Sequence, residues 1–127
     1  MPTFTKAERL SLQREIDLLF DGGKAFTAYP LRTLYVKQKP FSGVPVSLLI
    51  SVPKKRFKRA VKRNRVKRLI RETYRLNKTS LWESLSASGQ GLLVAFIYIG
   101  NEVCDFDVME RAMKKAITLL KALPHDK

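Results

Sequence analysis

The sequence has few of the residues that build metal sites and covalent catalysts. Its 127 residues include one cysteine, Cys104, and one histidine, His125, which lies in the C-terminal tail. A zinc site needs a cluster of such side chains, and a Cys–His nucleophile needs two of them close together. We therefore expect no metal site and no catalytic residue in this chain, and we expect Cys104 to be a small packing residue.

Long apolar runs are also missing. The longest apolar stretch, Gly91 to Ile99, is roughly half the ~20 residues that a membrane-spanning helix needs. It is rich in β-branched and aromatic residues, so it is typical of a buried strand. The N-terminus has no apolar run of signal-peptide length, and a lone cysteine cannot form an internal disulfide. These features predict a cytoplasmic protein that has no membrane partner.

Acidic residues are scarce. Eleven Asp and Glu residues face twenty-five Lys and Arg residues, which gives a net charge of +14. This excess is larger than solubility requires, so it indicates a polyanionic partner. Asp105, Asp107 and Glu110 cluster where a helix is expected to begin, and the helix dipole favours negative charge there. We interpret them as residues of a helix start.

The spacing of apolar residues predicts an α+β chain with the element order αβββαβα. Helices are expected at 11–21, 60–77 and 106–123, and strands at 24–28, 31–36, 46–52 and 92–99. The polar segment 79–90 is expected to be a loop with at most a short helix around Trp82. A chain of this length can bury one core, so we expect a single domain, 1–127, with one mixed central sheet packed with helices as an α/β sandwich.

Nearly all the excess charge lies between Lys54 and Lys78. This segment holds thirteen cations and one anion, Glu72, whereas the rest of the chain holds twelve cations and ten anions. Helical spacing places the apolar residues on one side and the cations on the other. The predicted apolar side is Val66, Leu69, Ile70, Thr73 and Tyr74, and the predicted basic side is Arg65, Lys67, Arg68, Arg71 and Arg75.

A basic helix face of this kind favours a ligand that carries phosphates. Like charges four residues apart repel by a few tenths of a kcal/mol per pair, and surface helices usually mix signs. Asn64 stands among the cations and has two readings. It could hydrogen-bond a base or a 2′-hydroxyl, or it could order the local backbone.

Two segments carry a resemblance to a known family. Residues 51–55, SVPKK, and residues 60–72, AVKRNRVKRLIRE, closely resemble the signature of the bacterial ribonuclease P protein subunit. Arg9, Leu10, Phe20 and Gly23 upstream fit the same pattern, while the chain from Thr79 onward matches only in element order. In that family a small protein joins a large catalytic RNA, and the complex removes the 5′ leader from precursor tRNA.

The resemblance implies partners, a cofactor and site residues. The partners would be ribonuclease P RNA, bound 1:1, and precursor tRNA, and the catalytic groups with their Mg²⁺ ions would belong mainly to the RNA. The chain would then be a subunit of a ribonucleoprotein endonuclease. The implied RNA-binding residues are Lys54, Lys55, Arg63, Asn64, Arg65, Lys67, Arg68 and Arg71.

The resemblance also implies a leader-binding cleft between the first helix and a face of the sheet, where aromatic rings can stack on bases. Its residues would be Phe20, Tyr35, Ser51 and Lys54, although the position of Phe20 on an apolar stripe equally suits a core residue. The connector 56–59 departs from the family pattern because it lacks a glycine and is one residue longer. The family further implies a left-handed crossover between parallel strands, against the general preference for right-handed ones.

Three other functions fit parts of the pattern. A ribosomal-type RNA-binding protein or RNA chaperone without an enzyme partner would share the charge and the fold class. A DNA-binding protein could place the helix 60–77 in a major groove, but base readout usually needs Asn, Gln or Ser among the cations. An independent nuclease would need paired carboxylates, for which Asp105 and Asp107 are the candidates.

Overall fold

The elements follow the predicted order wherever they can be compared. The computed structural model describes residues 22–38, 45–55 and 57–122. Its strands and helices are β1 (Lys24–Ala28), β2 (Leu31–Gln38), β3 (Val46–Ser51), α2 (Ala60–Ser88), β4 (Gly91–Tyr98) and α3 (Phe106–Lys121). The α+β class is confirmed. The helix predicted at 11–21, together with Phe20, lies outside the described residues.

The strands form one mixed sheet in the order β1-β2-β4-β3. β1 and β2 form an antiparallel hairpin through Tyr29 and Pro30, which are joined by a cis peptide bond. β4 lies between β2 and β3, antiparallel to β2 and parallel to β3. Helix α2 connects the parallel pair β3 and β4. The left hand of this crossover stays a prediction.

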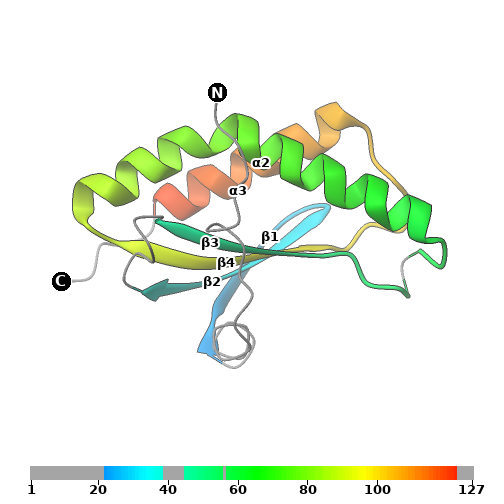
Figure 1. Ribbon diagram of the computed structural model, residues 1–127, viewed down its shortest axis with the longest axis horizontal. Helices are drawn as coiled ribbons and strands as arrows, with labels where there is room; N and C mark the ends of the chain where they lie inside the picture. The colour runs from blue at the N-terminus through cyan, green and yellow to red at the C-terminus, as the bar shows by residue number, and fades with distance from the viewer. Residues whose placement is uncertain (1–21, 39–44, 56, 123–127) are drawn as a thin grey trace.

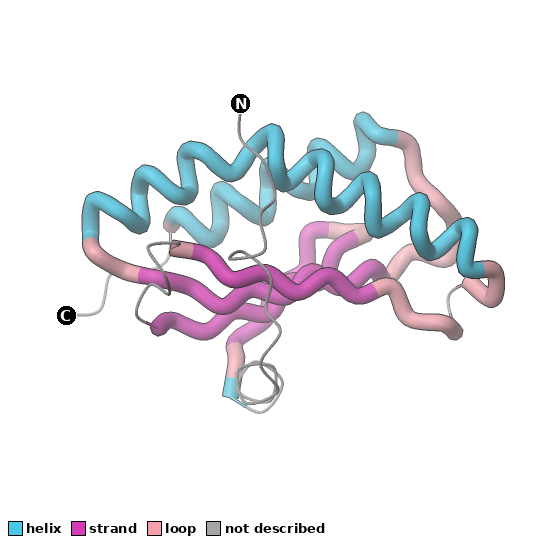
Figure 2. The backbone as a smooth tube through the Cα atoms, viewed as in Figure 1, coloured by secondary structure: helices cyan, strands magenta, loops and turns pink. Residues whose placement is uncertain are grey.

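Both described helices cover the same face of the sheet (Figure 1), which the tube view also shows as a helical layer above a strand layer (Figure 2). Helix α2 contacts β3 and β4, and α3 contacts β1 and β2. The main core lies between these two layers. We call the sheet surface under α2 and α3 the helix face, and the opposite surface the second face.

Strand β4 is apolar along its whole length because both of its faces are buried. Val94, Phe96 and Tyr98 belong to the main core on the helix face, whereas Leu93 and Ala95 form a separate cluster on the second face. Successive side chains of a strand point to opposite faces, so a central strand needs apolar residues at every position. This explains the continuous apolar run that predicted a buried strand.

Helix α2 is longer than predicted, and the loop expected at 79–90 was wrong. The helix runs through this segment to Ser88, because Leu81 and Leu85 continue its buried side while polar residues occupy its exposed side. It ends at Gly89, whose φ of 69° is the left-handed conformation that commonly closes a helix. Within the described residues, neither helix combines the length and apolar character needed to cross a membrane.

A polar contact inside α2 explains why the helix continues past residue 77. The indole N–H of Trp82 donates a hydrogen bond of 3.0 Å to the Tyr74 hydroxyl, two turns earlier. The ammonium of Lys78 lies 4.5 Å from the centre of the Trp82 ring, a cation–π contact. Lys78 is buried on the apolar side of the helix. A lysine at this position interrupts the apolar spacing, so the spacing did not predict that the helix continues.

Candidate nucleic-acid interface

The first half of α2 has the two sides that its spacing predicts. Val66, Ile70 and Tyr74 are fully buried against the sheet. On the opposite side Arg65 and Arg68 are exposed, and Lys67 and Arg71 are half-buried. The apolar side thus anchors the helix to the sheet, and the anchored helix presents its cations in a fixed arrangement.

The cations of this half-helix continue into the loop that precedes it. We define the basic surface as the exposed and half-buried cations from the end of β3 to the middle of α2, apart from Arg63: Lys54, Lys55, Lys58, Arg59, Lys62, Arg65, Lys67, Arg68 and Arg71. The sequence between Lys54 and Arg71 contains no acidic residue. The first turn of α2 therefore has no acid to offset the positive end of the helix dipole, which adds to the field of the side chains.

Arg63 differs from the other cations because its guanidinium is bonded to the connector. Its Nη1 donates hydrogen bonds to the carbonyl oxygens of Phe57, at 2.7 Å, and Lys58, at 3.0 Å. The Phe57 ring is buried and lies 5.9 Å from the ring of Tyr98 at the end of β4. Arg63 therefore fastens the connector to α2, a structural role that the sequence did not indicate.

Asn64 is exposed, and within the described part of the chain its side chain makes no hydrogen bond. One of its two predicted readings was the ordering of the local backbone. In this structure Arg63 performs that role. The exposed Asn64 side chain is thus accessible to a ligand.

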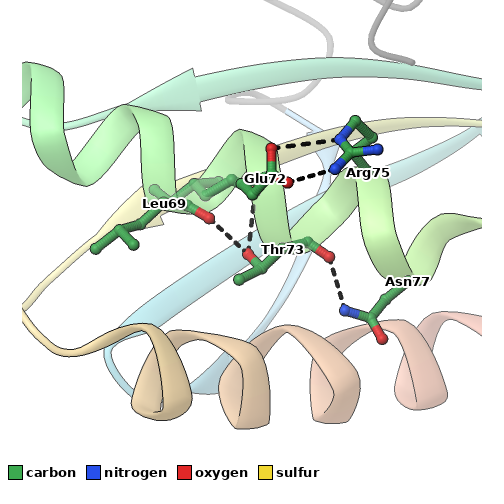
Figure 3. A network of polar contacts seen from close by, with 6 residues as sticks. Leu69, Glu72, Thr73, Arg75 and Asn77 are labelled. Carbon is green, nitrogen blue, oxygen red and sulfur yellow. Dashed lines mark hydrogen bonds and ion pairs between the residues drawn. The ribbon is translucent and has the colours of Figure 1, made fainter. Parts of the chain in front are cut away.

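Glu72 and Arg75 mark the end of the basic surface. Arg75 donates hydrogen bonds to both carboxylate oxygens of Glu72, and the Nε to Oε2 distance is 3.3 Å (Figure 3). The hydrogen bond from Arg75 lowers the pKa of Glu72 below its usual value. The predicted basic side thus ends in an ion pair, in which the charge of Arg75 is balanced by that of Glu72.

Of the predicted leader-cleft residues, Tyr35, Ser51 and Lys54 lie in the described part of the chain, and they do not share one face of the sheet. Tyr35 lies on the helix face, where it packs against the main core with its ring 5.9 Å from that of Phe26. Ser51 lies opposite Ile97 in the sheet register, and Ile97 belongs to the second face. Lys54 is exposed just beyond β3. Tyr35 and Ser51 therefore lie on opposite faces of the sheet, so a cleft on one face cannot include both of them.

The residue of β2 that shares the second face with Ser51 is Leu34. Neighbouring residues of a strand point to opposite faces, so a shift of one position places a side chain on the other face of the sheet. Leu34 packs with Leu93 and Ala95 in the cluster of the second face. If Leu31 is taken as a core residue, alternation along β2 places Leu34 on the opposite face. The sequence did not make this clear, because β2 has apolar residues on both faces.

A pocket of about 380 Å³ opens at the end of the second face next to the basic surface. Its cationic lining residues are Arg32 and Lys55, and its apolar lining includes Leu34, Pro53 and Ile97. Cations beside an apolar wall suit a nucleotide, whose phosphate and base need different partners. Arg32 was not among the binding residues predicted from the sequence, although its place two residues before Leu34 puts it on the same face.

The carboxylates considered for a nuclease lie at the start of α3. Asp105 is the residue that precedes the helix, and Asp107 lies in its first turn. Both are exposed, and Asp105 forms no capping hydrogen bond through its side chain. Over the described ranges, no three His, Cys, Asp or Glu residues are grouped closely enough to hold a metal ion.

Comparison with known proteins gives consistent matches. Residues 4–121 match the family model described as Ribonuclease P. A ribonuclease P protein component from Porphyromonas gingivalis is 49% identical over 118 residues, which is 91% of this chain and 86% of that protein. One from Chlorobaculum tepidum is 38% identical over 90 residues, 65% of this chain and 58% of that protein.

Two solved structures have the same fold. The RNase P protein from Thermotoga maritima has a TM-score of 0.66 and 28% identity, over 93% of this chain and 99% of that chain. An RNase P protein structure from Staphylococcus aureus has a TM-score of 0.69 and 19% identity, over 90% of this chain and 95% of that chain.

Proposed function

Because this chain belongs to the ribonuclease P protein family, we propose that it binds ribonuclease P RNA and helps that RNA remove the 5′ leader of precursor tRNA. The observation that carries the proposal is the basic surface, in which nine cations gather on the loop after β3 and on the first half of α2. We place the complex in the cytoplasm, with one protein bound to one RNA.

The basic surface suits RNA because its cations are closely spaced and the helix that carries most of them is held by a packed core. Each phosphate that it neutralises releases condensed counterions, so binding should weaken steeply with salt. If six to ten of these cations meet phosphates, affinity should fall about 10³ to 10⁵-fold between 50 and 200 mM salt. Buried Val66 and Ile70 fix the helix on the sheet, so its backbone does not have to become ordered on binding.

We assign bond cleavage and the Mg²⁺ ions to the RNA. The protein would contribute charge, since cations placed between two phosphate backbones reduce the repulsion between enzyme RNA and substrate. That repulsion is otherwise screened by ions, so the protein should lower the magnesium concentration needed for cleavage. Low-magnesium conditions are therefore the most informative assay conditions.

For the leader, we propose a path along the second face of the sheet. Ser51 lies on this face, and Lys55 lines the pocket at its end together with Arg32 and Leu34. Leu34 replaces Tyr35 in this assignment. The cations bind backbone phosphates, and the apolar wall accepts bases without regard to sequence.

The test is reconstitution with a bacterial ribonuclease P RNA. Cleavage of precursor tRNA is measured at low magnesium with the RNA alone, the protein alone and the complex. Stimulation of the RNA supports the proposal. Cleavage by the protein alone would contradict it, and RNA binding without stimulation would instead support a ribosomal-type RNA-binding protein or RNA chaperone.

A paired variant tests the basic surface itself. Arg65→Ala with Arg68→Ala removes two cations from it, and Lys114→Ala with Lys115→Ala removes two exposed cations from α3. The first pair should lower affinity for the RNA subunit at least tenfold and reduce the salt slope by about two. Equal effects of both pairs would show that binding responds only to net charge.

A further inference from the structure

Tyr29 is an unusually exposed aromatic residue. It occupies the two-residue turn between β1 and β2 and is 69% exposed, although most aromatic rings of the described chain are at least partly buried. Its neighbour Pro30 is buried, so the turn is held in place while the Tyr29 ring faces solvent. The packing of the fold gives no reason for a large ring at this position.

A pocket of about 460 Å³ lies beside Tyr29. Residues of the turn, of β4 and of the segment that leads to α3 line it, including Tyr29, Tyr98, Gly100, Asn101, Val103 and Val108. Contacts of Tyr98 with Glu102 and Gly100 hold one wall of this pocket in place. The Tyr98 hydroxyl donates a hydrogen bond to the Glu102 carbonyl, and a Cβ at Gly100 would lie 2.9 Å from the Tyr98 hydroxyl oxygen.

This pocket adjoins the pocket on the second face. Tyr98 lines both of them, and Arg32 and Lys55 line only the second-face pocket. Phe57 of the connector packs on the same Tyr98. Figure 1 shows the loop after β3, the start of α2 and the loop between β4 and α3 at one end of the sheet. The Tyr29 pocket thus lies next to the proposed RNA path.

The charges of the two pockets differ in a way that suggests which part of a nucleotide each accepts. The only charged residue that lines the Tyr29 pocket is Glu102, which is exposed. An acid there disfavours a phosphate and tolerates an uncharged base. Arg32 and Lys55 supply the opposite charge in the adjoining pocket.

We infer that the Tyr29 pocket is a base-binding subsite for single-stranded RNA, in which Tyr29 stacks on one base while Arg32 and Lys55 bind the phosphates of neighbouring nucleotides. The inference rests on the proposed function, and its ligand is the part of the leader beyond the second face of the sheet. Stacking on an exposed ring is tolerant of base identity, because every base has a π-face.

The test uses the reconstituted complex and three substrates: precursor tRNA with a leader of about ten nucleotides, precursor tRNA with a leader of about two, and mature tRNA. Tyr29→Ala should weaken binding of the long-leader substrate about tenfold and leave the other two unchanged. Tyr29→Trp should retain the affinity. Leu76→Ala, which removes an exposed apolar side chain from α2, is the matched control.

A second measurement follows individual leader positions by fluorescence. A fluorescent base analogue is placed at each leader position in turn, and its quenching on binding to the unchanged protein is recorded. Quenching at a position that Tyr29→Ala abolishes supports the subsite. Absence of quenching along the leader, or equal losses for all three substrates, overturns it.

The two proposals fail in different ways. If Tyr29→Ala has no effect while the Arg65 and Arg68 pair loses RNA binding, the subsite is wrong and the proposed function stands. If the unchanged protein neither binds nor stimulates the RNA, the proposed function itself fails. Quenching of a leader-length RNA by the protein in the absence of ribonuclease P RNA, with no stimulation, would support a general single-strand binder.

Discussion

The guanidinium of Arg63 reaches back from α2 and donates a hydrogen bond of 2.7 Å to the carbonyl oxygen of Phe57. A second bond to the Lys58 carbonyl closes the same loop. The connector contains no glycine, and its shape is held by this side chain and by the packing of Phe57 on Tyr98. A cation of the basic segment is therefore also a structural support for its neighbours.

Arg63→Ala should consequently do more than remove a charge. We expect residues 57–59 to exchange their amide hydrogens faster and to be cut more readily by trypsin, because two side-chain bonds to that backbone are lost. Arg65→Ala removes the same charge without touching the connector and is the control. Hydrogen exchange followed by mass spectrometry compares the two variants, and equal protection of 57–59 in both would rule out the supporting role.

Glu72→Gln should strengthen RNA binding. Glu72 is the only acid between Lys54 and Lys78, and it holds Arg75 in an ion pair. Removing its charge makes the surface more positive, so affinity for the RNA subunit should rise a few-fold and the salt slope should become steeper by up to about one. The measurement is a salt titration of binding. Glu110→Gln on α3 is the matched control, and an equal gain there would point to net charge alone.

The ionisation of Glu72 should show the influence of Arg75 directly. Its pKa is lowered in the folded protein by the hydrogen bond from Arg75. The pair therefore contributes stability above the usual pKa of a glutamate, and that contribution is lost as the pH falls through the lowered value. Carbon-detected NMR titration of the Glu72 carboxyl tests this, with Arg75→Gln expected to return the pKa toward its usual value. An unchanged midpoint in that variant would contradict the assignment.

Thr33→Val should stabilise the fold. Thr33 is fully buried on β2, and its hydroxyl oxygen has no hydrogen-bond partner in the described part of the chain. Valine keeps the shape and removes the cost of burying an unpaired hydroxyl, so we expect a gain of about 1 kcal/mol and a melting temperature about 4 °C higher.

Thr73→Val provides the comparison for this change. Thr73 is equally buried, but its hydroxyl donates to the Leu69 carbonyl at 2.8 Å (Figure 3). Its replacement should be neutral or destabilising, because a made hydrogen bond is lost. Thermal unfolding of both variants decides the matter, and a similar rise for both would show that the gain comes from added apolar surface.

Tyr74→Phe should destabilise the second half of α2. The change removes the acceptor for the Trp82 indole N–H, which is part-buried, at a cost of about 1 kcal/mol. Trp82 is the only tryptophan, so its fluorescence reports on the site without interference. We expect a lower unfolding midpoint and a shifted emission maximum in the folded variant. An unaltered spectrum would mean that the hydrogen bond is absent in solution.

The sequence predicted best what depends on local spacing. The apolar and basic sides of α2 follow from helical periodicity and are confirmed by buried Val66 and Ile70 opposite exposed Arg65 and Arg68. The end of α2 was missed because a buried lysine, Lys78, interrupts the apolar pattern. A cation–π contact with Trp82 compensates that burial, and no local rule indicates such a contact.

Features that depend on the pairing of strands could not be predicted from the spacing of residues. The place of β4 between β2 and β3 is set by contacts between distant segments. The same limit applies to the faces of β2, which has apolar residues on both sides, so spacing did not show that Tyr35 and Ser51 lie on opposite faces of the sheet. Arg63 shows a further limit, because the resemblance implied an RNA contact and no rule of spacing indicated its hydrogen bonds to the connector.

The central position of β4 has a consequence for synthesis of the chain. β2 and β3 each pair with β4, which follows both of them and the cationic half of α2 in the chain. Until residues 91–98 emerge, the helix that carries the basic surface has no complete sheet to pack on. Completing the sheet requires contacts between segments that are distant in the sequence. We therefore expect the basic surface to take its folded arrangement only after β4 has been inserted between β2 and β3.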